Sequence, residues 1–308
     1  MFFVLGLLTS CNGQSTAVTP HITPTRASST TAPSTKTPQT PVPTPTPAPA
    51  PAHYTSHVVL RGVGRPDDLA FDAQGRLLFS DEISGTINRL NADGTVTRIL
   101  NDRAGPEGLV PQTDGTLIFA EQETNRIMSL APGSQTPAVL RTLPGVSGTL
   151  TCKHGVDSIT LDATTYTLIV PDSPTGEVYR MSLDGKTLTL LASGIARPVG
   201  ADVDPAGNIY VADECGGAFW RITPTGNATR MGGFGMPDDV VYDGHGNLLL
   251  VDLAPAIHAL IRVNLTTMQH ETLASQGFIE PQGLLLDTQG HIFVSDDYAN
   301  IIVEYSPA

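Results

Sequence analysis

Residues 237–252 read PDDVVYDGHGNLLLVD, and residues 66–81 read PDDLAFDAQGRLLFSD. Both stretches begin with a proline and two acids and continue through a short apolar run to a turn that contains Asp and Gly. Each then ends in a second apolar run closed by an acid. Short apolar runs bounded by Pro, Asp and Gly are typical of paired β-strands. The pattern therefore predicts a β-hairpin that the chain uses more than once.

The same pattern occurs six times, and this repetition decides the fold class. The segments start at Pro66, Pro106, Val156, Pro198, Pro237 and Pro281, with spacings of 40, 50, 42, 39 and 44 residues. A further alternating strand follows each hairpin, as TINRL, NRIMSL, EVYRMSL, AFWRI, ALIRV and IIVEY. A period of about 40 residues with four short strands is typical of a β-propeller blade. We predict an all-β, six-bladed β-propeller over residues 53–308.

The last repeat has only three strands before the chain stops, whereas a spare strand precedes the first repeat. This spare strand is formed by residues 53–62, HYTSHVVLRG. Pairing it with the last blade would close the ring and remove an exposed sheet edge. We expect this closure.

The residues before the propeller read as an export signal and a tether. Residues 1–11, MFFVLGLLTSC, form an apolar run much shorter than the roughly 20 residues that span a bilayer. Residues 8–11 resemble the bacterial lipobox, which implies that Cys11 carries the lipid; an ordinary buried start to the chain is the alternative. Residues 12–52 contain 10 Pro and 11 Thr among 41 residues, so we expect a disordered linker. The prediction is an extracytoplasmic lipoprotein anchored to the bacterial cell membrane.

Charge and motifs narrow the class of partner. From residue 53 onward the chain has 15 Lys and Arg against 30 Asp and Glu, a formal net charge of −15. Binding to nucleic acid requires clustered positive charge, so we expect no nucleic-acid partner. The chain has no GxSxG elbow, P-loop or HExxH motif. We expect a monomer that binds cations and a small-molecule or protein ligand.

The residue after each repeat's first position lies where an inner strand begins, so these residues should gather at one end of the propeller axis. They are Asp67, Glu107, Asp157, Val199, Asp238 and Gln282. Crowded carboxylates raise one another's pKa unless a cation compensates them. Calcium accepts six to eight oxygen ligands in loose geometry and is our first choice, with magnesium second. The predicted metal ligands are Asp67, Glu107, Asp157 and Asp238; a site without metal is the alternative.

Other acids reach the same face at the ends of the second strands. They are Asp81, Glu82, Glu121, Asp172, Asp213, Glu214, Asp252, Asp296 and Asp297, and Asp68 and Asp239 lie beside the inner ring. An Asp at such a position commonly accepts hydrogen bonds from nearby backbone amides. We interpret the acids that close the second strands as turn caps and not as metal ligands.

The repeats resemble two known propeller families over residues 53–308. Segments such as PQGLLLDTQGHIFVSDDYANIIVEY resemble NHL repeats. The polar residues after the prolines resemble the senescence marker protein and gluconolactonase family, in which a channel-mouth metal held by Glu, Asn and Asp activates water against lactones. Asp238 and Asp67 match that family's Pro-Asp aspartate, and Glu107 stands for its glutamate. The Pro-Asn-Gly ligand is missing, because this chain has Pro198-Val199-Gly200, and the family's early Glu, Pro and Trp are absent.

Two function classes therefore stay open. The resemblance implies a Ca²⁺-dependent lactonase or esterase in which Asp238 is the catalytic base. The alternative is a noncatalytic, NHL-type module that binds a sugar, peptide or protein on its acidic face.

Cys152 and Cys215 lie in connections that should meet on the acidic face of neighbouring blades. The environment outside the cytoplasm permits oxidation of their thiols. We therefore predict a Cys152–Cys215 disulfide, with two separate buried thiols as the alternative. The long connection before Cys152 produces the 50-residue spacing. We interpret it as a surface loop with a solvated His154; a lid that places His154 beside the acids is the alternative.

Overall fold

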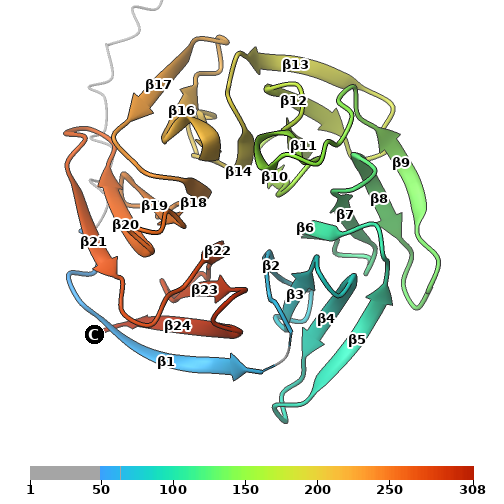
Figure 1. The fold of residues 1–308 in the computed structure, drawn as a ribbon, viewed down its shortest axis with the longest axis horizontal. Helices are drawn as coiled ribbons and strands as arrows, with labels where there is room; N and C mark the ends of the chain where they lie inside the picture. The colour runs from blue at the N-terminus through green and yellow to red at the C-terminus, as the bar shows by residue number, and fades with distance from the viewer. Residues whose placement is uncertain (1–48, 63) are drawn as a thin grey trace, which may run out of the picture. The chain divides into compact units, whose positions relative to one another are not determined.

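The structure is a computed structural model that describes residues 49–62 and 64–308, and these residues form a six-bladed β-propeller (Figure 1). The predicted export signal, Cys11 and almost all of the predicted linker lie outside the described residues. Each blade is a four-stranded antiparallel sheet, and in five of the six blades the four strands follow one another in the sequence. The all-β, six-bladed prediction is confirmed.

The strands occupy four concentric positions around the axis. The innermost strands are β2 (Leu69–Phe71), β6 (Pro106–Pro111), β10 (Thr160–Asp162), β14 (Pro198–Val203), β18 (Pro237–Tyr242) and β22 (Pro281–Leu286). The second strands are β3 (Leu77–Asp81), β7 (Leu117–Glu121), β11 (Thr167–Asp172), β15 (Ile209–Asp213), β19 (Asn247–Asp252) and β23 (Ile292–Asp296). The third strands are β4 (Thr86–Leu90), β8 (Arg126–Leu130), β12 (Glu177–Ser182), β16 (Ala218–Ile222), β20 (Ala259–Asn264) and β24 (Ile301–Pro307). The outer strands are β5 (Val96–Asn101), β9 (Ala138–Thr142), β13 (Leu188–Ser193), β17 (Ala228–Gly232), β21 (His270–Ala274) and β1 (Tyr54–Arg61).

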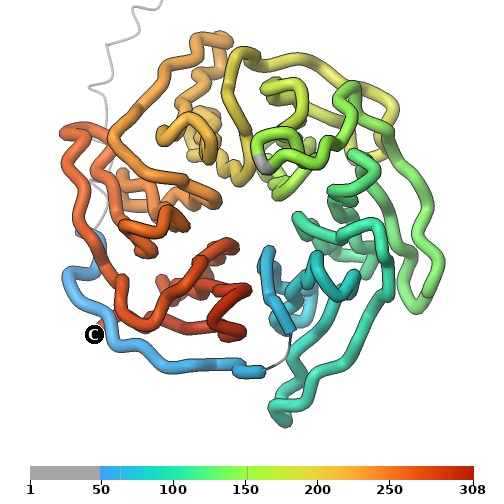
Figure 2. Tube along the Cα trace, viewed as in Figure 1, coloured from blue at the N-terminus to red at the C-terminus, as the bar shows by residue number. Residues whose placement is uncertain are grey.

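The N-terminal strand closes the ring. Strand β1 pairs antiparallel with β24, from Tyr54 opposite Pro307 to Arg61 opposite Ile301. Figure 2 shows the blue N-terminal segment running along the outside of the red final blade. The predicted closure is confirmed.

The hydrophobic core lies between neighbouring blades, because both faces of the second strands are buried. All five residues of β3 and all five of β7 are buried. One cluster joins Leu78 and Ile87 of the first blade to Phe119 and Met128 of the second. Such clusters between blades hold the ring together through apolar contacts.

Carboxylates add polar links between the innermost strands. Oδ2 of Asp68 accepts a hydrogen bond of 2.6 Å from the amide of Leu109 in the next blade. Oδ2 of Asp239 accepts one of 3.0 Å from the amide of Leu284. These buried acids satisfy backbone donors of the adjacent blade, which is a structural role.

The turns between first and second strands lie at the opposite end of the axis from the predicted acidic face. In the first blade, Oδ1 of Asp72 accepts hydrogen bonds from the amides of Gln74 and Arg76, and Gly75 takes a φ of 72°. Glycine adopts this left-handed conformation without the steric cost that other residues bear.

The described residues contain two short 3₁₀ turns, η1 (Thr151–Lys153) and η2 (Glu214–Gly216). Among residues 49–62 and 64–308, no helix has the length and apolar character that a membrane crossing requires.

Candidate functional site

The inner-strand acids gather around a cavity of about 250 Å³ at one end of the propeller axis. The starts of four blades bring Asp67, Glu107, Asp157 and Asp238 to its wall, and Gln282 joins them. The sixth position, Val199, is fully buried in the core. The structure thus places all four predicted metal ligands on one cavity.

Three carboxylates of this cavity are close enough to hold one ion. Asp67, Glu82 and Glu107 each offer a carboxylate oxygen, and these three oxygens lie within 4.8 Å of one another. Glu82 follows the second strand of the first blade, so it was expected only as a turn acid. The close group therefore contains two of the four predicted ligands and one acid, Glu82, that we interpreted as a turn cap.

Glu107 has an unpartnered oxygen inside this group. Its side chain is 1% exposed, and its Oε1 accepts a hydrogen bond of 3.2 Å from Nε2 of Gln122. Its Oε2 is buried and has no hydrogen-bond partner among the described residues. A buried carboxylate oxygen without a hydrogen-bond donor costs free energy, and a bound cation or a proton on this oxygen would remove that cost.

Asp157 is compensated differently, because an arginine lies beside it. Nη2 of Arg197 donates to Oδ2 of Asp157 at 2.9 Å, and Nη1 of the same guanidinium pairs with Glu214. Arg197 is 5% exposed. Gln122 also donates to Oδ2 of Asp157, at 3.3 Å. One buried cation therefore neutralises part of the acidic wall from within the chain.

Burial makes the remaining acids hard to ionise. It raises the pKa values of Asp67, Glu107 and Asp238 well above the usual carboxyl range, and repulsion from neighbouring carboxylates raises them further. Burial also raises the pKa of Asp157, although the positive charge of Arg197 acts in the opposite direction. A further cation, beyond the guanidinium of Arg197, would favour the ionised form of these three acids.

The aspartates that close the second strands act as loop caps, as interpreted from the sequence. Oδ1 of Asp213 accepts from the amides of Arg197 and Gly216. Asp252 accepts from the amides of Gly235 and Met236. Equivalent bonds hold Asp81, Asp172 and Asp296. Backbone amides thus donate to each of these carboxylates, as a turn cap requires.

The predicted disulfide is present. Cys152 and Cys215 are bonded, with their Cα atoms 5.9 Å apart. The bond joins η1, at the end of the long insertion, to η2 in the next blade. It ties the loop that leads into Asp157 to the loop that carries Glu214.

His154 is placed differently from our interpretation. It lines the cavity and is half-buried, whereas we interpreted it as a solvated side chain on a surface loop. The disulfide two residues earlier ties this part of the chain to the neighbouring blade, and His154 shares the cavity lining with the acids. Its positive charge, when protonated, lowers the pKa of Asp157.

Sequence reasoning missed the cavity's two arginines. Arg197 pairs with two acids, and Arg65 lies 3.8 Å over the ring of Tyr298 and 3.2 Å from Oδ2 of Asp297. Each arginine directly precedes the proline that starts a repeat, as the dipeptides at 65–66 and 197–198. Those two Arg-Pro pairs were the available signal.

The fold and the axial cavity define a six-bladed β-propeller with an acidic channel mouth. No protein-family model and no curated protein matches the sequence. The fold is similar to that of a streptogramin B lyase at 15% identity, with 85% of this chain and 100% of that chain covered and a TM-score of 0.63. It is also similar to a protein assigned as a gluconolactonase, at 15% identity, 83% and 93% coverage and a TM-score of 0.64. A PQQ-bound aldose sugar dehydrogenase from Streptomyces coelicolor gives 17% identity, 84% and 99% coverage and a TM-score of 0.65. At these identities the likeness establishes the fold alone.

Proposed function

We propose that the axial cavity binds a divalent cation, Ca²⁺ in first place and Mg²⁺ in second. The observation that carries this proposal is the close group of Asp67, Glu82 and Glu107, together with the buried Oε2 of Glu107, which has no hydrogen-bond partner among the described residues. The donor set fits the ion, since all three groups are carboxylates and hard cations prefer oxygen ligands. Asp157 and Asp238, the other two predicted ligands, line the same cavity.

We further propose that the protein is a metal-dependent lactone or ester hydrolase. When bound, the ion supplies Lewis-acid polarisation of a substrate carbonyl. Asp238 lines the same cavity and accepts the proton of the attacking water. Its pKa is raised by burial and by the charges of Asp157 and Asp67, so a nearby cation promotes the ionised form that a base requires.

A second function, that of a noncatalytic binding module, is favoured by two other observations. Arg197 already compensates Asp157 and Glu214, so part of the acidic wall is stable without metal. The cavity also includes two exposed apolar side chains, Ile83 at 62% and Tyr298 at 57% exposure. An aromatic ring beside polar groups suits a sugar, a peptide or a protein loop.

Two measurements separate these functions. Calorimetric titration of the chelator-treated protein with CaCl₂ and with MgCl₂ tests the ion; heats that match buffer dilution for both would reject it. A panel of lactones and aryl esters, assayed with and without EDTA, then tests catalysis. A hydrolase loses turnover in EDTA and in Asp238→Asn while its circular dichroism spectrum stays unchanged. Calcium binding without turnover on any member of the panel supports the binding module.

We also propose that the propeller is held outside the cytoplasm as a monomer, on a lipid attached at Cys11. The Cys152–Cys215 disulfide supports an oxidising compartment. Pairing of β1 with β24 supports the monomer, because it leaves no open third strand in the last blade. Incorporation of labelled palmitate in bacterial cells, and its loss in Cys11→Ala, tests the anchor. Light scattering of the delipidated protein tests the oligomeric state.

A further inference from the structure

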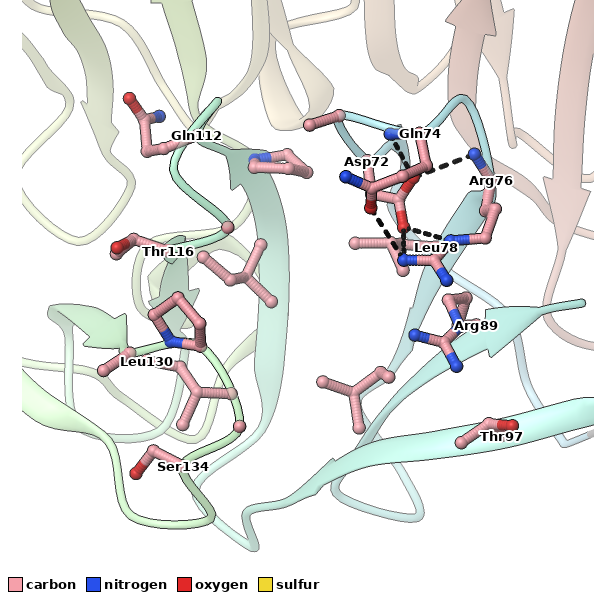
Figure 3. A pocket seen from close by; sticks show the side chains of 18 of the residues that line it. Asp72, Gln74, Arg76, Leu78, Arg89, Thr97, Gln112, Thr116, Leu130 and Ser134 are labelled. Atoms are coloured by element: carbon pink, nitrogen blue, oxygen red, sulfur yellow. Dashed lines mark hydrogen bonds and ion pairs between the residues drawn. The ribbon is translucent and has the colours of Figure 1, made fainter.

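A second cavity, of about 470 Å³, lies between the first and second blades, on the side of the turns and away from the acidic mouth. Its walls combine the first blade's turn at residues 72–76 and its two outer strands with turns of the second blade (Figure 3). Leu78, Leu117 and Leu130 are buried side chains that form its apolar base. We call this space the interblade groove. Its volume is within the range of cavities that hold small organic ligands.

The interblade groove is cationic, although the chain is acidic overall. Its charged residues are Arg76, Arg89, Arg98 and a single acid, Asp72. The folded part of the chain has a formal net charge of −15, so a local excess of arginine is unusual here. An anionic ligand fits this charge, because Coulomb attraction favours it over a neutral or cationic one.

Arg89 is one of four equivalent arginines, and comparison among the blades shows what is different about it. Each lies on the third strand of its blade. Its cross-strand partner is the residue three positions before the Asp that ends the second strand. The four arginines are Arg89, Arg180, Arg221 and Arg262. In the third blade, Nη1 of Arg180 pairs with Asp162. In the fifth blade, Arg262 pairs with Glu271 and also donates to the carbonyl of Pro51.

The first blade lacks this internal pairing. Asp72 holds the position that Asp162 has in the third blade, but Arg76 takes it, with Nη2 2.7 Å from Oδ2 of Asp72. Arg89 is left with a single bond, from Nε to Oδ1 of Asn91 at 3.2 Å. Neither Nη atom of Arg89 has a partner among the described residues. Figure 3 shows this side chain directed into the space between the blades.

We propose that the interblade groove binds a small amphipathic carboxylate. The two Nη atoms of Arg89 form the planar fork that a carboxylate accepts with both oxygens. The apolar base formed by Leu78, Leu117 and Leu130 takes the hydrocarbon part of the ligand. The nearby Asp72 disfavours a doubly charged head such as a phosphate monoester, so the head carries one negative charge.

The test uses the full chain and sodium octanoate as the probe, with calorimetry at neutral pH. We expect octanoate to bind and the uncharged octanamide not to bind. Arg89→Gln should weaken octanoate binding by about tenfold or more, because charge-assisted hydrogen bonds are lost. The equivalent Arg221→Gln, in the fourth blade, should leave octanoate binding unchanged and serves as the matched control.

A second variant copies the fifth blade's own arrangement into the first. Thr97 is the cross-strand partner of Arg89, as Glu271 is of Arg262. In Thr97→Glu, the new carboxylate should form an ion pair with Arg89. This variant should therefore lose octanoate binding without loss of thermal stability. Equal binding of octanoate and octanamide would overturn the proposal, as would unchanged binding by both Arg89→Gln and Thr97→Glu. Tighter binding of octyl phosphate than of octanoate would overturn the assignment to a carboxylate.

Discussion

Arg197 and Asp157 form a buried ion pair at the channel mouth, with Nη2 2.9 Å from Oδ2. Arg197 belongs to the fourth blade and Asp157 to the third, so the bond crosses between two blades. A buried charge that loses its partner bears the full cost of desolvation. This relationship makes the stability of the acidic wall depend on one guanidinium.

We expect Arg197→Met to lower the free energy of unfolding by about 3–5 kcal/mol, because it leaves Asp157 and Glu214 buried without a cation. Urea denaturation in EDTA measures this change. Arg230→Gln is the control, since Arg230 is exposed and, among residues 49–62 and 64–308, donates only to the carbonyl of Gly216. Its effect should stay within about 0.5 kcal/mol. A loss below about 1 kcal/mol for Arg197→Met would contradict the assigned role.

Glu107→Gln should have opposite effects in the absence and presence of calcium. Without the ion, stability should stay equal or rise, because the substitution removes a buried carboxylate whose Oε2 has no donor. At a calcium concentration of about 100 times Kd, the wild-type chain gains about 2.7 kcal/mol by linkage, and the variant should lose most of that gain. Thermal unfolding with and without CaCl₂ gives both values.

The control for that pair of measurements is Glu123→Gln. Glu123 is exposed and does not line the axial cavity. It should keep the wild-type response to calcium. If Glu107→Gln and Glu123→Gln respond alike, Glu107 is not a ligand.

Removal of the disulfide should destabilise the propeller and weaken the axial site together. The bond closes a loop between residues 63 positions apart, and the double change Cys152→Ser and Cys215→Ser should cost about 2–4 kcal/mol. It also frees the loop that carries His154 from the loop that carries Glu214. Calcium titration of this variant should give a weaker affinity than wild type. An unchanged affinity would show that the bond supports the fold alone.

The calcium-free protein should become less stable as the pH rises from 5 to 8. Burial raises the pKa of Asp68 to about 7 and that of Asp202 to about 6. Because both folded-state pKa values lie above the unfolded value, these groups stabilise the fold at low pH and lose that contribution as pH rises through 6 and 7. Urea unfolding in EDTA should show a decrease of about 4 kcal/mol from these two groups over this interval.

Asp68→Asn should flatten that pH dependence, because it removes one of the titrating groups. Asp93→Asn should leave the pH dependence as it is, since Asp93 is exposed and hydrogen bonds from Thr95 lower its pKa. Stability that is constant or increasing between pH 5 and 8 would contradict the buried, protonated state of Asp68.

The fold was readable from the sequence because each blade repeats the same local signals. Proline starts, Asp-Gly turns and alternating apolar residues specify hairpins locally, and the repeat period then fixes the ring. Closure by β1 followed from counting strands, and the Cys152–Cys215 bond followed from placing two loops on one face of neighbouring blades. These inferences needed no knowledge of side-chain direction.

The axial site was harder to predict from the sequence, because the residues that form it differ from blade to blade. Arg197 has a counterpart only in Arg65, and the pairing of Arg197 with both Asp157 and Glu214 depends on the crossing between blades. Glu82 occupies a position that reads as a turn acid, yet it faces Glu107 and Asp67. Such a grouping depends on which side chains turn inward, and residue spacing does not determine that direction.

The seam between β1 and β24 also sets an order on assembly. The ribosome makes β1 first and β24 last, so the first strand to emerge waits for nearly the whole chain before its partner exists. The circle can therefore be completed only as the final step, and a ribosome-stalled chain that lacks residues 301–307 retains an unpaired N-terminal strand. During synthesis there is therefore a period in which five blades can be complete while the β1–β24 pairing of the sixth blade has not yet formed.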